Sequence, residues 1–192
     1  MATEPKEHTQ NIQPKEEHKP ESSAPKIDPV EYFNKHIELK VAKILSVETN
    51  PQGDKLYIEH LDDGSGTERI IQSGLRPYLK EEELLGKHVI IAANLAPRKM
   101  KGVESRGMLL ASDYVEDGVE KVELLTAPWA APGTQVVLEG FEPFEKPSKI
   151  GIDKFCKVEY KIVNKMAQAA GKNLVAAGKP IVMEKTVNAD IE

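Results

Sequence analysis

Alternating apolar and polar residues predict strands through the middle of the chain. In "HIELKVAKILSVE", residues 36–48, Ile37, Leu39 and Val41 lie on one side and charged residues lie between them. This period of two is typical of a half-buried strand. The alternation changes parity at Ala42, which we interpret as a β-bulge that bends a long strand around a small barrel.

Further short strands are expected along the chain, separated by turn sequences such as "NPQGD" and "DDGSG". They cover residues 55–62, 67–74, 87–95, 107–113, 119–125 and 134–138. A short helix is predicted over 77–86, between the third and fourth strands. This pattern predicts a mainly β protein and favours the OB-fold, a five-stranded Greek-key barrel. OB-folds bind oligonucleotides on strands two and three and on the loops after strands one and four.

The two ends of the chain have other compositions. Residues 1–29 contain five prolines, ten charged residues and no aromatic residue, which predicts a disordered tail or linker. Residues 30–144 are expected to form the OB-fold domain. Residues 145–192 are too few for a convincing core of their own, so we expect an α+β extension packed on the barrel.

The extension is predicted to begin with a helix that ends at Gly171. A hairpin turning at Gly178 is expected to follow. Cys156 would lie on the apolar side of the helix, which predicts a buried thiol. The helix prediction rests on the spacing of Phe155, Val158, Ile162, Met166 and Ala169.

Charge is unevenly distributed in this acidic chain. The net charge is −5, which opposes nonspecific nucleic-acid binding by the whole surface. The connection between the fourth and fifth predicted strands nevertheless carries four cationic residues and one acid, Glu104. Charges are screened over only about 8 Å at physiological salt, so a local cationic patch can still bind a polyanion. We expect the four cations to face outward together on one surface: Arg98, Lys99, Lys101 and Arg106.

Other classes of function find little support. No apolar run approaches the roughly 20 residues of a membrane span, and the N-terminus has no secretory signal pattern. A single cysteine cannot form an internal disulfide, which favours a reducing cytoplasm. The histidines lack metal-ligand spacing, and no phosphate-binding glycine motif occurs. We therefore expect no catalytic residues, no metal and no cofactor.

Four segments together resemble a known family. "DKLYIEHLDDG", "RIIQSGL", "NLAPRKMKGVESRGMLLAS" and "APWAAPGTQV" resemble, in order and spacing, the tRNA-binding domain of the endothelial-monocyte-activating polypeptide II type. The resemblance implies a noncatalytic OB-fold that binds tRNA by shape and backbone, and an aminoacyl-tRNA synthetase as a fused or associated partner. It also implies the eukaryotic subtype, a monomer whose C-terminal extension covers the surface through which bacterial relatives dimerise.

Charge and the family resemblance together indicate ten candidate tRNA-binding residues, of which seven are cationic and three are uncharged. The alternative for the cationic residues is that they lie on an ordinary solvated surface. The alternative for the uncharged residues is that they cap loops. The candidates are Lys40, Lys43, Lys55, Asn94, Arg98, Lys99, Lys101, Ser105, Arg106 and Ser112.

Several further readings stay open. Tyr57 offers a surface on which a base can stack, or it is half buried. Arg69 extends the positive face or is an ordinary strand charge. Met108 is expected in the core, and Trp129 is expected to dock the C-terminal extension. The alternative function is a protein–protein scaffold of a synthetase complex with weak RNA binding, which the acidic net charge favours.

Overall fold

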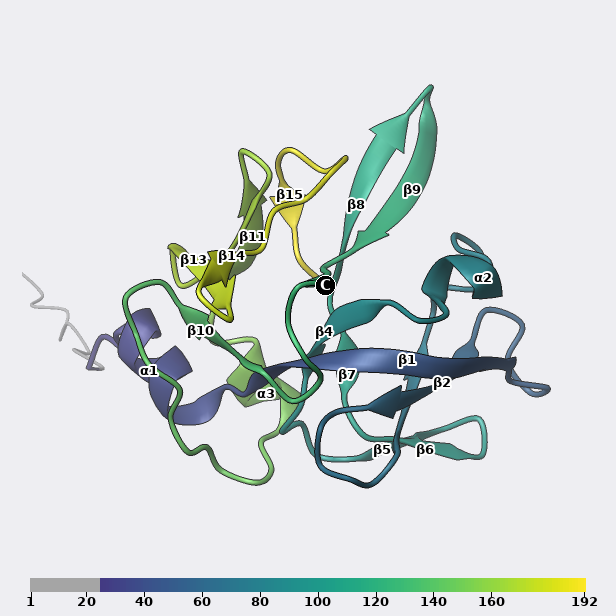
Figure 1. The fold of residues 1–192 in the computed structure, drawn as a ribbon, viewed down its shortest axis with the longest axis horizontal. Helices are drawn as coiled ribbons and strands as arrows, with labels where there is room; N and C mark the ends of the chain where they lie inside the picture. Colours follow the sequence, from purple (N-terminus) through teal and green to yellow (C-terminus); the bar gives the residue numbers. More distant parts are fainter. Residues whose placement is uncertain (1–24) are drawn as a thin grey trace, which may run out of the picture.

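The computed structural model describes residues 25–192, so most of the predicted tail over residues 1–29 lies outside the described residues. The first element is helix α1 (Pro29–His36), drawn in purple in Figure 1. The Asp28 side chain accepts hydrogen bonds from the backbone N–H groups of Val30 and Glu31, and proline occupies the first turn. Both features favour the start of a helix. Apolar alternation does not reveal such a start, so our sequence analysis did not predict α1.

A five-stranded antiparallel barrel occupies the middle of the chain. The strands are β1 (Leu39–Thr49), β2 (Tyr57–Asp62), β3 (Arg69–Ser73), β4 (His88–Ala92) and β7 (Met108–Leu109). The pairings run β3–β2–β1–β4–β7. Strand β1 is the long ribbon that crosses the molecule in Figure 1. The expected mainly β, OB-type fold is confirmed.

The first part of β1, up to Ile44, and strand β4 are buried on both faces, and this corrects our interpretation of the parity change. Leu39 and Val41 join the apolar cluster shared with the C-terminal extension, whereas Ala42 and Ile44 join the cluster inside the barrel. The register shift of β1 against β2 falls two residues later than expected, between Ile44 and Ser46. A bulge therefore exists, but the change at Ala42 reflects a second packed face.

The predicted helix over 77–86 is shorter than expected. Helix α2 covers Glu81–Leu84, and Gly86, at φ +79°, follows it in a conformation that glycine adopts readily. The expected strand over 107–113 divides into β7 and β8 (Ala111–Glu116). Strand β8 pairs with β9 (Val119–Leu124), and the hairpin projects from the body of the molecule (Figure 1).

The C-terminal extension is mainly β, so the predicted long helix is wrong. Only α3 (Ile152–Phe155) is helical. Antiparallel pairing joins β15–β11–β12–β13–β14. The strands are β11 (Tyr160–Val163), β12 (Met166–Ala169), β13 (Lys172–Ala176), β14 (Lys179–Pro180) and β15 (Ala189–Asp190).

Turn chemistry explains the error in the helix prediction. Asn164 and Lys165, at φ +50° and +68°, form the turn between β11 and β12, and such two-residue turns suit the twist of a hairpin. The buried residues then follow a period of two, as Tyr160 and Ile162 do in β11. Cys156 follows the short α3 and is exposed, so the prediction of a buried thiol is wrong as well.

The extension packs on the barrel through hydrogen bonds and apolar contacts. Strand β10 (Gln135–Leu138) pairs with both β1 and β13. The Trp129 indole donates to the Ala176 carbonyl at 2.8 Å, which confirms the expected docking role of Trp129. The Glu123 carboxylate on β9 accepts backbone N–H groups from residues 184, 185 and 186 at 2.7, 3.1 and 2.8 Å.

We expect Glu123→Ala to lower the free energy of unfolding by about 1.5–3 kcal/mol, because it leaves three backbone donors without their charged acceptor. Urea denaturation measures this change. The matched control is Glu120→Ala on the exposed end of the same strand, which should change stability little. Equal effects of the two variants would contradict the role given to Glu123.

Candidate nucleic-acid interface

The cationic connection between β4 and β7 is a hairpin instead of an open loop. Strand β5 (Arg98–Met100) pairs with β6 (Val103–Ser105). Lys101 and Gly102 form the turn, at φ +46° and +84°. Both central residues of a tight two-residue hairpin need positive φ, so glycine suits the second position.

Two buried amides fix this β5–β6 hairpin to the barrel. Gln72 Nε2 donates to the carbonyls of Met100 and Val103 at 2.7 and 3.0 Å. Asn50 Nδ2 donates to Gln72 Oε1 at 2.8 Å and also contacts the Lys101 carbonyl at 3.3 Å. The hairpin is thus held in place by groups that our sequence analysis did not single out.

Arg69 holds the base of the same hairpin. Its Nε donates to Asp63 at 2.7 Å, and its Nη1 donates to the carbonyls of Ala93 and Arg106 at 2.9 and 2.6 Å. Burial alone would raise the pKa of the Asp63 carboxyl, but hydrogen bonds from Ser65 and Arg69 outweigh burial and hold the pKa below its usual value. Arg69 therefore has a structural role, and we do not count it as part of the positive face.

Individual hydrogen bonds, one between backbone groups and one from a backbone N–H to a side chain, take the place of a regular ladder between β3 and the segment 105–109. We call this junction the seam. The Arg106 N–H donates to the Ile70 carbonyl at 2.8 Å, and the Gln72 N–H donates to the Ser105 hydroxyl at 3.0 Å. Within residues 25–192, β3 has no ladder partner besides β2. The β5–β6 hairpin completes the barrel wall there.

The four cations do not share one surface, which corrects our expectation. Neighbouring residues of a strand point to opposite faces, so Arg98 and Lys99 diverge across the hairpin. Arg98 lines the larger of two hollows beside it, and Arg106 lines the smaller one. The Arg106 side chain is also paired with Glu104 at 2.9 Å. Cations thus surround the hairpin instead of forming one flat patch.

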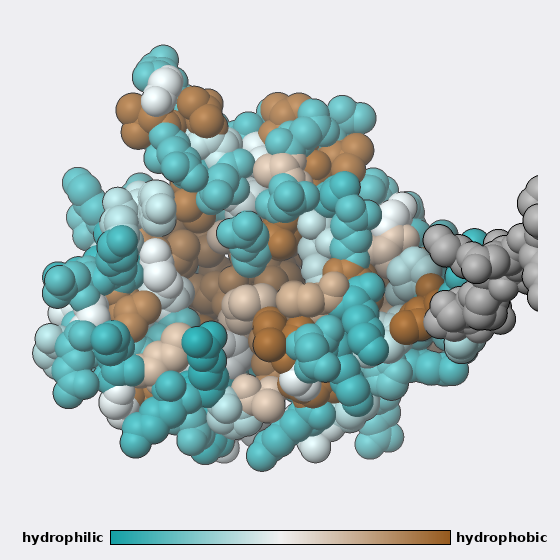
Figure 2. Space-filling view, turned by 180° about the vertical axis from the view of Figure 1, so that it is seen from behind, coloured by the Kyte–Doolittle hydropathy of each residue, from teal (hydrophilic) through white to brown (hydrophobic). Residues whose placement is uncertain are grey.

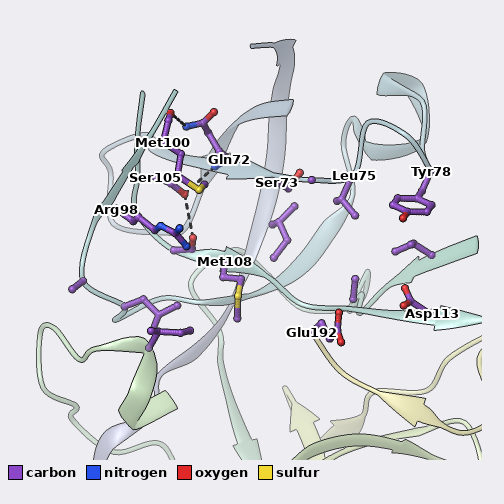
Figure 3. A pocket seen from close by; sticks show the side chains of 18 residues that line it. Gln72, Ser73, Leu75, Tyr78, Arg98, Met100, Ser105, Met108, Asp113 and Glu192 are labelled. Atoms are coloured by element: carbon purple, nitrogen blue, oxygen red, sulfur yellow. Dashed lines mark hydrogen bonds between the residues drawn. The ribbon is translucent and has the colours of Figure 1, made fainter. Parts of the chain in front are cut away.

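A groove of about 620 Å³ runs along the seam. Figure 3 places Arg98, Met100 and Ser105 at one end and Tyr78 with Asp113 at the other. Met108 lies between them, half buried and packed against the apolar core. The hollowed centre of the face in Figure 2 is largely apolar, with polar side chains around it. The groove therefore joins an apolar floor to a cationic end.

The three uncharged candidates are buried, with partners inside the protein. Asn94 accepts from the Glu38 N–H and donates to the carbonyls of His36 and Pro147. The Ser105 hydroxyl accepts from Gln72 and donates to the Gly107 carbonyl, and the Ser112 hydroxyl donates to Thr186. These bonds match the capping alternative, so the candidates that remain for direct contact are the cations.

The other three cationic candidates lie outside the groove. Lys55 is exposed in the turn that follows β1, and this turn meets the hairpin through the contact of Asn50 with Lys101. Lys40 and Lys43 lie on β1. Lys40 is 3.4 Å from the Glu38 carboxylate, and Lys43 stands opposite Asp62 in the β1–β2 ladder.

The aromatic residue available for stacking is Tyr78 instead of Tyr57. Tyr57 is buried, and its hydroxyl donates to the Leu79 carbonyl at 2.9 Å. Tyr78 lines the groove and is 48% exposed. Our sequence analysis assigned Tyr78 to a helix. The preceding Pro77 was the local signal in the sequence that Tyr78 could lie in a turn instead of a helix.

Glu59 lies inside the barrel next to the groove. It is fully buried on β2, and one of its oxygens accepts from the hydroxyl of Ser73, a groove residue. Its other oxygen has no hydrogen-bond partner within residues 25–192. Burial raises the pKa of the Glu59 carboxyl to about 8, although the bond from Ser73 opposes this shift. The raised pKa favours the protonated form of Glu59 at neutral pH.

With this geometry established, comparison with known proteins identifies the family. The profile described as "Putative tRNA binding domain" matches residues 39–135, which include the β5–β6 hairpin and the seam. The chain belongs to this tRNA-binding domain family. The C-terminal domain of Plasmodium vivax p43 shares the fold, with a TM-score of 0.73 and 24% sequence identity. That likeness covers 83% of this chain and 98% of the p43 domain, so it reaches into the extension.

Relatives in sequence are parts of larger enzymes. The chain is 54% identical over 172 residues to the methionine–tRNA ligase of Treponema denticola, covering 83% of this chain and 22% of the ligase. It is 38% identical over 163 residues to the cytoplasmic tyrosine–tRNA ligase of Xenopus tropicalis, covering 81% of this chain and 30% of the ligase. Because the bacterial match covers most of the chain, the extended form is not confined to eukaryotes.

Two further findings concern the described residues. None of the helices in residues 25–192 is both long and apolar enough to cross a membrane. Over the same residues, His, Cys, Asp and Glu side chains form no group of three or more that is placed to hold a metal ion.

The raised pKa of Glu59 predicts a pH dependence of stability. Between the ordinary value of 4.5 and about 8, the unfolded chain releases a proton that the folded protein keeps. The free energy of unfolding should therefore fall as pH rises through this range, by up to about 1.4 kcal/mol per pH unit. Above pH 8 this contribution becomes constant.

Urea denaturation across pH 5 to 8 checks this prediction. Glu59→Gln, which cannot ionise, should lack this part of the pH dependence, whereas the exposed-site control Glu120→Gln should keep it. If Glu59→Gln and the wild type show the same pH profile, Glu59 is ionised in the folded protein and the assignment is wrong.

Proposed function

We propose that this chain is a noncatalytic tRNA-binding module that holds tRNA for an aminoacyl-tRNA synthetase. The observation that carries the proposal is the family match over residues 39–135, which includes an exposed hairpin with cations on both faces. The synthetase is either fused to the module or associated with it, as the names of the matched ligases suggest.

The β5–β6 hairpin would bind RNA through its exposed cationic side chains. Arg98, Lys99 and Lys101 are exposed, and in residues 25–192 none of them has an ion-pair partner within 4.0 Å. Charges on two faces can contact phosphates on both sides of an RNA groove. Such contacts carry little sequence information, and RNA helices are recognised largely by shape, phosphates and 2′-hydroxyl groups.

Binding of this kind would assist an enzyme through local concentration. A weak general tRNA binder linked to a synthetase makes the second contact intramolecular, so affinity rises without any new contact in the catalytic site. A monomer whose extension covers one barrel face and a cytoplasmic location are parts of this proposal. The packing of the extension on β10 supports the monomer, and the relationship to the cytoplasmic tyrosine–tRNA ligase of Xenopus tropicalis supports the location.

A second candidate is a protein-docking scaffold with weak RNA affinity. The net charge of −5 and the acids near the tip of the projecting β8–β9 hairpin, Asp117 and Glu120, favour it, because these groups repel RNA. The dependence of tRNA affinity on salt separates the two candidates. A log–log slope of roughly −2 to −4 is expected for three or four phosphate contacts. No binding of bulk tRNA in low salt would favour the scaffold.

Replacing Arg98, Lys99 and Lys101 together by alanine should weaken the binding of all tRNAs about equally. The salt slope should become shallower by roughly 2–3, since each lost contact removes about 0.7–0.9. Fluorescence anisotropy with bulk tRNA and with several purified tRNAs measures both effects.

The matched control replaces Lys154, Lys172 and Lys179 of the extension, which are also exposed, and removes the same charge. This control should bind nearly as well as the wild type. Equal losses in the two triple variants would mean that total charge, and not the hairpin, determines binding.

A further inference from the structure

The groove along the seam has the features of a site for a single nucleotide. We propose that it binds one unpaired nucleotide of the RNA, with the base against Tyr78 and Met108 and the phosphate at Arg98. This inference rests on the proposed function and deepens it, because it adds an unstacked base to the backbone contacts of the hairpin.

Size and lining fit this ligand. The volume of about 620 Å³ lies within the roughly 300–1,000 Å³ of sites for small molecules, whereas an intact duplex is too wide to enter. The floor between the two ends is apolar and includes Met108 and Leu109, and Val122 of β9 lines one wall. An apolar slot with a few polar groups at its ends suits a flat base attached to a charged backbone.

The backbone at Tyr78 is held in place at the rim of the groove. The Tyr78 and Leu79 N–H groups both donate to the Leu75 carbonyl at 2.9 Å, and the Tyr57 hydroxyl fixes the Leu79 carbonyl from below. The Tyr78 ring itself remains about half exposed. An accessible ring on a fixed backbone loses less conformational entropy when a base stacks on it than a ring on a mobile loop, and stacking tolerates every base.

Arg98 connects the slot to the hairpin. Its side chain points into the groove in Figure 3, beside Met100 and Ser105, while Lys99 and Lys101 lie on the hairpin outside it. An RNA backbone that follows the hairpin would thus reach the groove at a cationic group. The carboxylates of Asp113 and Glu192 line the other end of the groove, so a phosphate would lie at the Arg98 end. The position of Arg98 next to the cations of the hairpin favours a nucleotide over an extended apolar peptide as the occupant.

The opposite wall gives the site a preference among bases. The carboxylate of Asp113, which faces Tyr78 across the groove, only accepts hydrogen bonds when it is ionised. Adenine, cytosine and guanine carry exocyclic amino groups, whereas uracil carries carbonyl oxygens at its corresponding positions. The site should therefore prefer an unpaired base with an amino group over uracil.

The experiment compares a blunt RNA duplex with the same duplex carrying a short 3′ overhang of adenines, by fluorescence anisotropy with the full chain. Wild type should bind the overhang RNA at least about fivefold more tightly, which is the lower end of what stacking of one base contributes. Tyr78→Ala should abolish this preference and leave the affinity for the blunt duplex unchanged. Tyr78→Phe should keep the preference, and an overhang of uridines should show less of it.

Controls separate the possible failures. Phe144→Ala removes another half-exposed ring, outside the groove, and should change neither affinity. If wild type binds neither RNA nor tRNA, the proposed function fails and this inference fails with it. If wild type binds both RNAs equally, or Tyr78→Ala keeps the preference, the proposed function stands and the nucleotide site is wrong. Displacement of the overhang RNA alone by an apolar peptide would assign the groove to a protein partner and overturn the proposal.

Discussion

The structure depends on how the barrel closes at the seam. Strands β3 and β7 come near each other without a ladder, and the β5–β6 hairpin takes the place of the missing pairing. Arg69 and Gln72 bind backbone carbonyls of the hairpin and of the adjoining chain from the barrel side. Since buried polar groups are costly when unpaired, these bonds allow one arrangement of the hairpin. The same hydrogen bonds therefore close the barrel and fix the position of the cationic hairpin.

This arrangement also explains how an acidic protein can present a cationic element. Charges separated by more than about 8 Å are largely screened at physiological salt, so the local surroundings of the exposed hairpin cations matter most. Two acids in those surroundings are occupied, because Glu104 is paired with Arg106 and Asp63 with Arg69. Local geometry, rather than net charge, then determines the field that an approaching polyanion meets.

The sequence predicted the barrel well, because its signals are local. Period-two alternation and turn residues placed strands β1 to β4 to within a few residues. The charged connection was expected as a loop, and its β5–β6 hairpin was not predicted. The helix predicted to end at Gly171 was wrong because Val158 and Ile162, four residues apart, satisfy both periods in a short window, and Asn164–Lys165 was not read as a turn. Signals in a single short segment cannot decide between two periods when pairing with distant strands provides the stability.

The site was only partly predictable for a related reason. Cationic residue types can be read from sequence, but which face each side chain occupies depends on strand register. The anchoring residues Asn50 and Gln72 are ordinary polar residues until residues far apart in the chain meet around them. Tyr57 and Tyr78 are equally aromatic in sequence, and only the fold buries one and exposes the other.

The pairing of β10 with β13 has a consequence for solubility during synthesis and storage. The backbone of Val137 and Leu138 is paired by β13, and a shortened chain ending before the extension would leave it open. Unpaired strand edges are templates on which other chains can add, and they promote aggregation. The extension thus covers a strand edge of the barrel that would otherwise promote aggregation, and this role does not depend on any ligand.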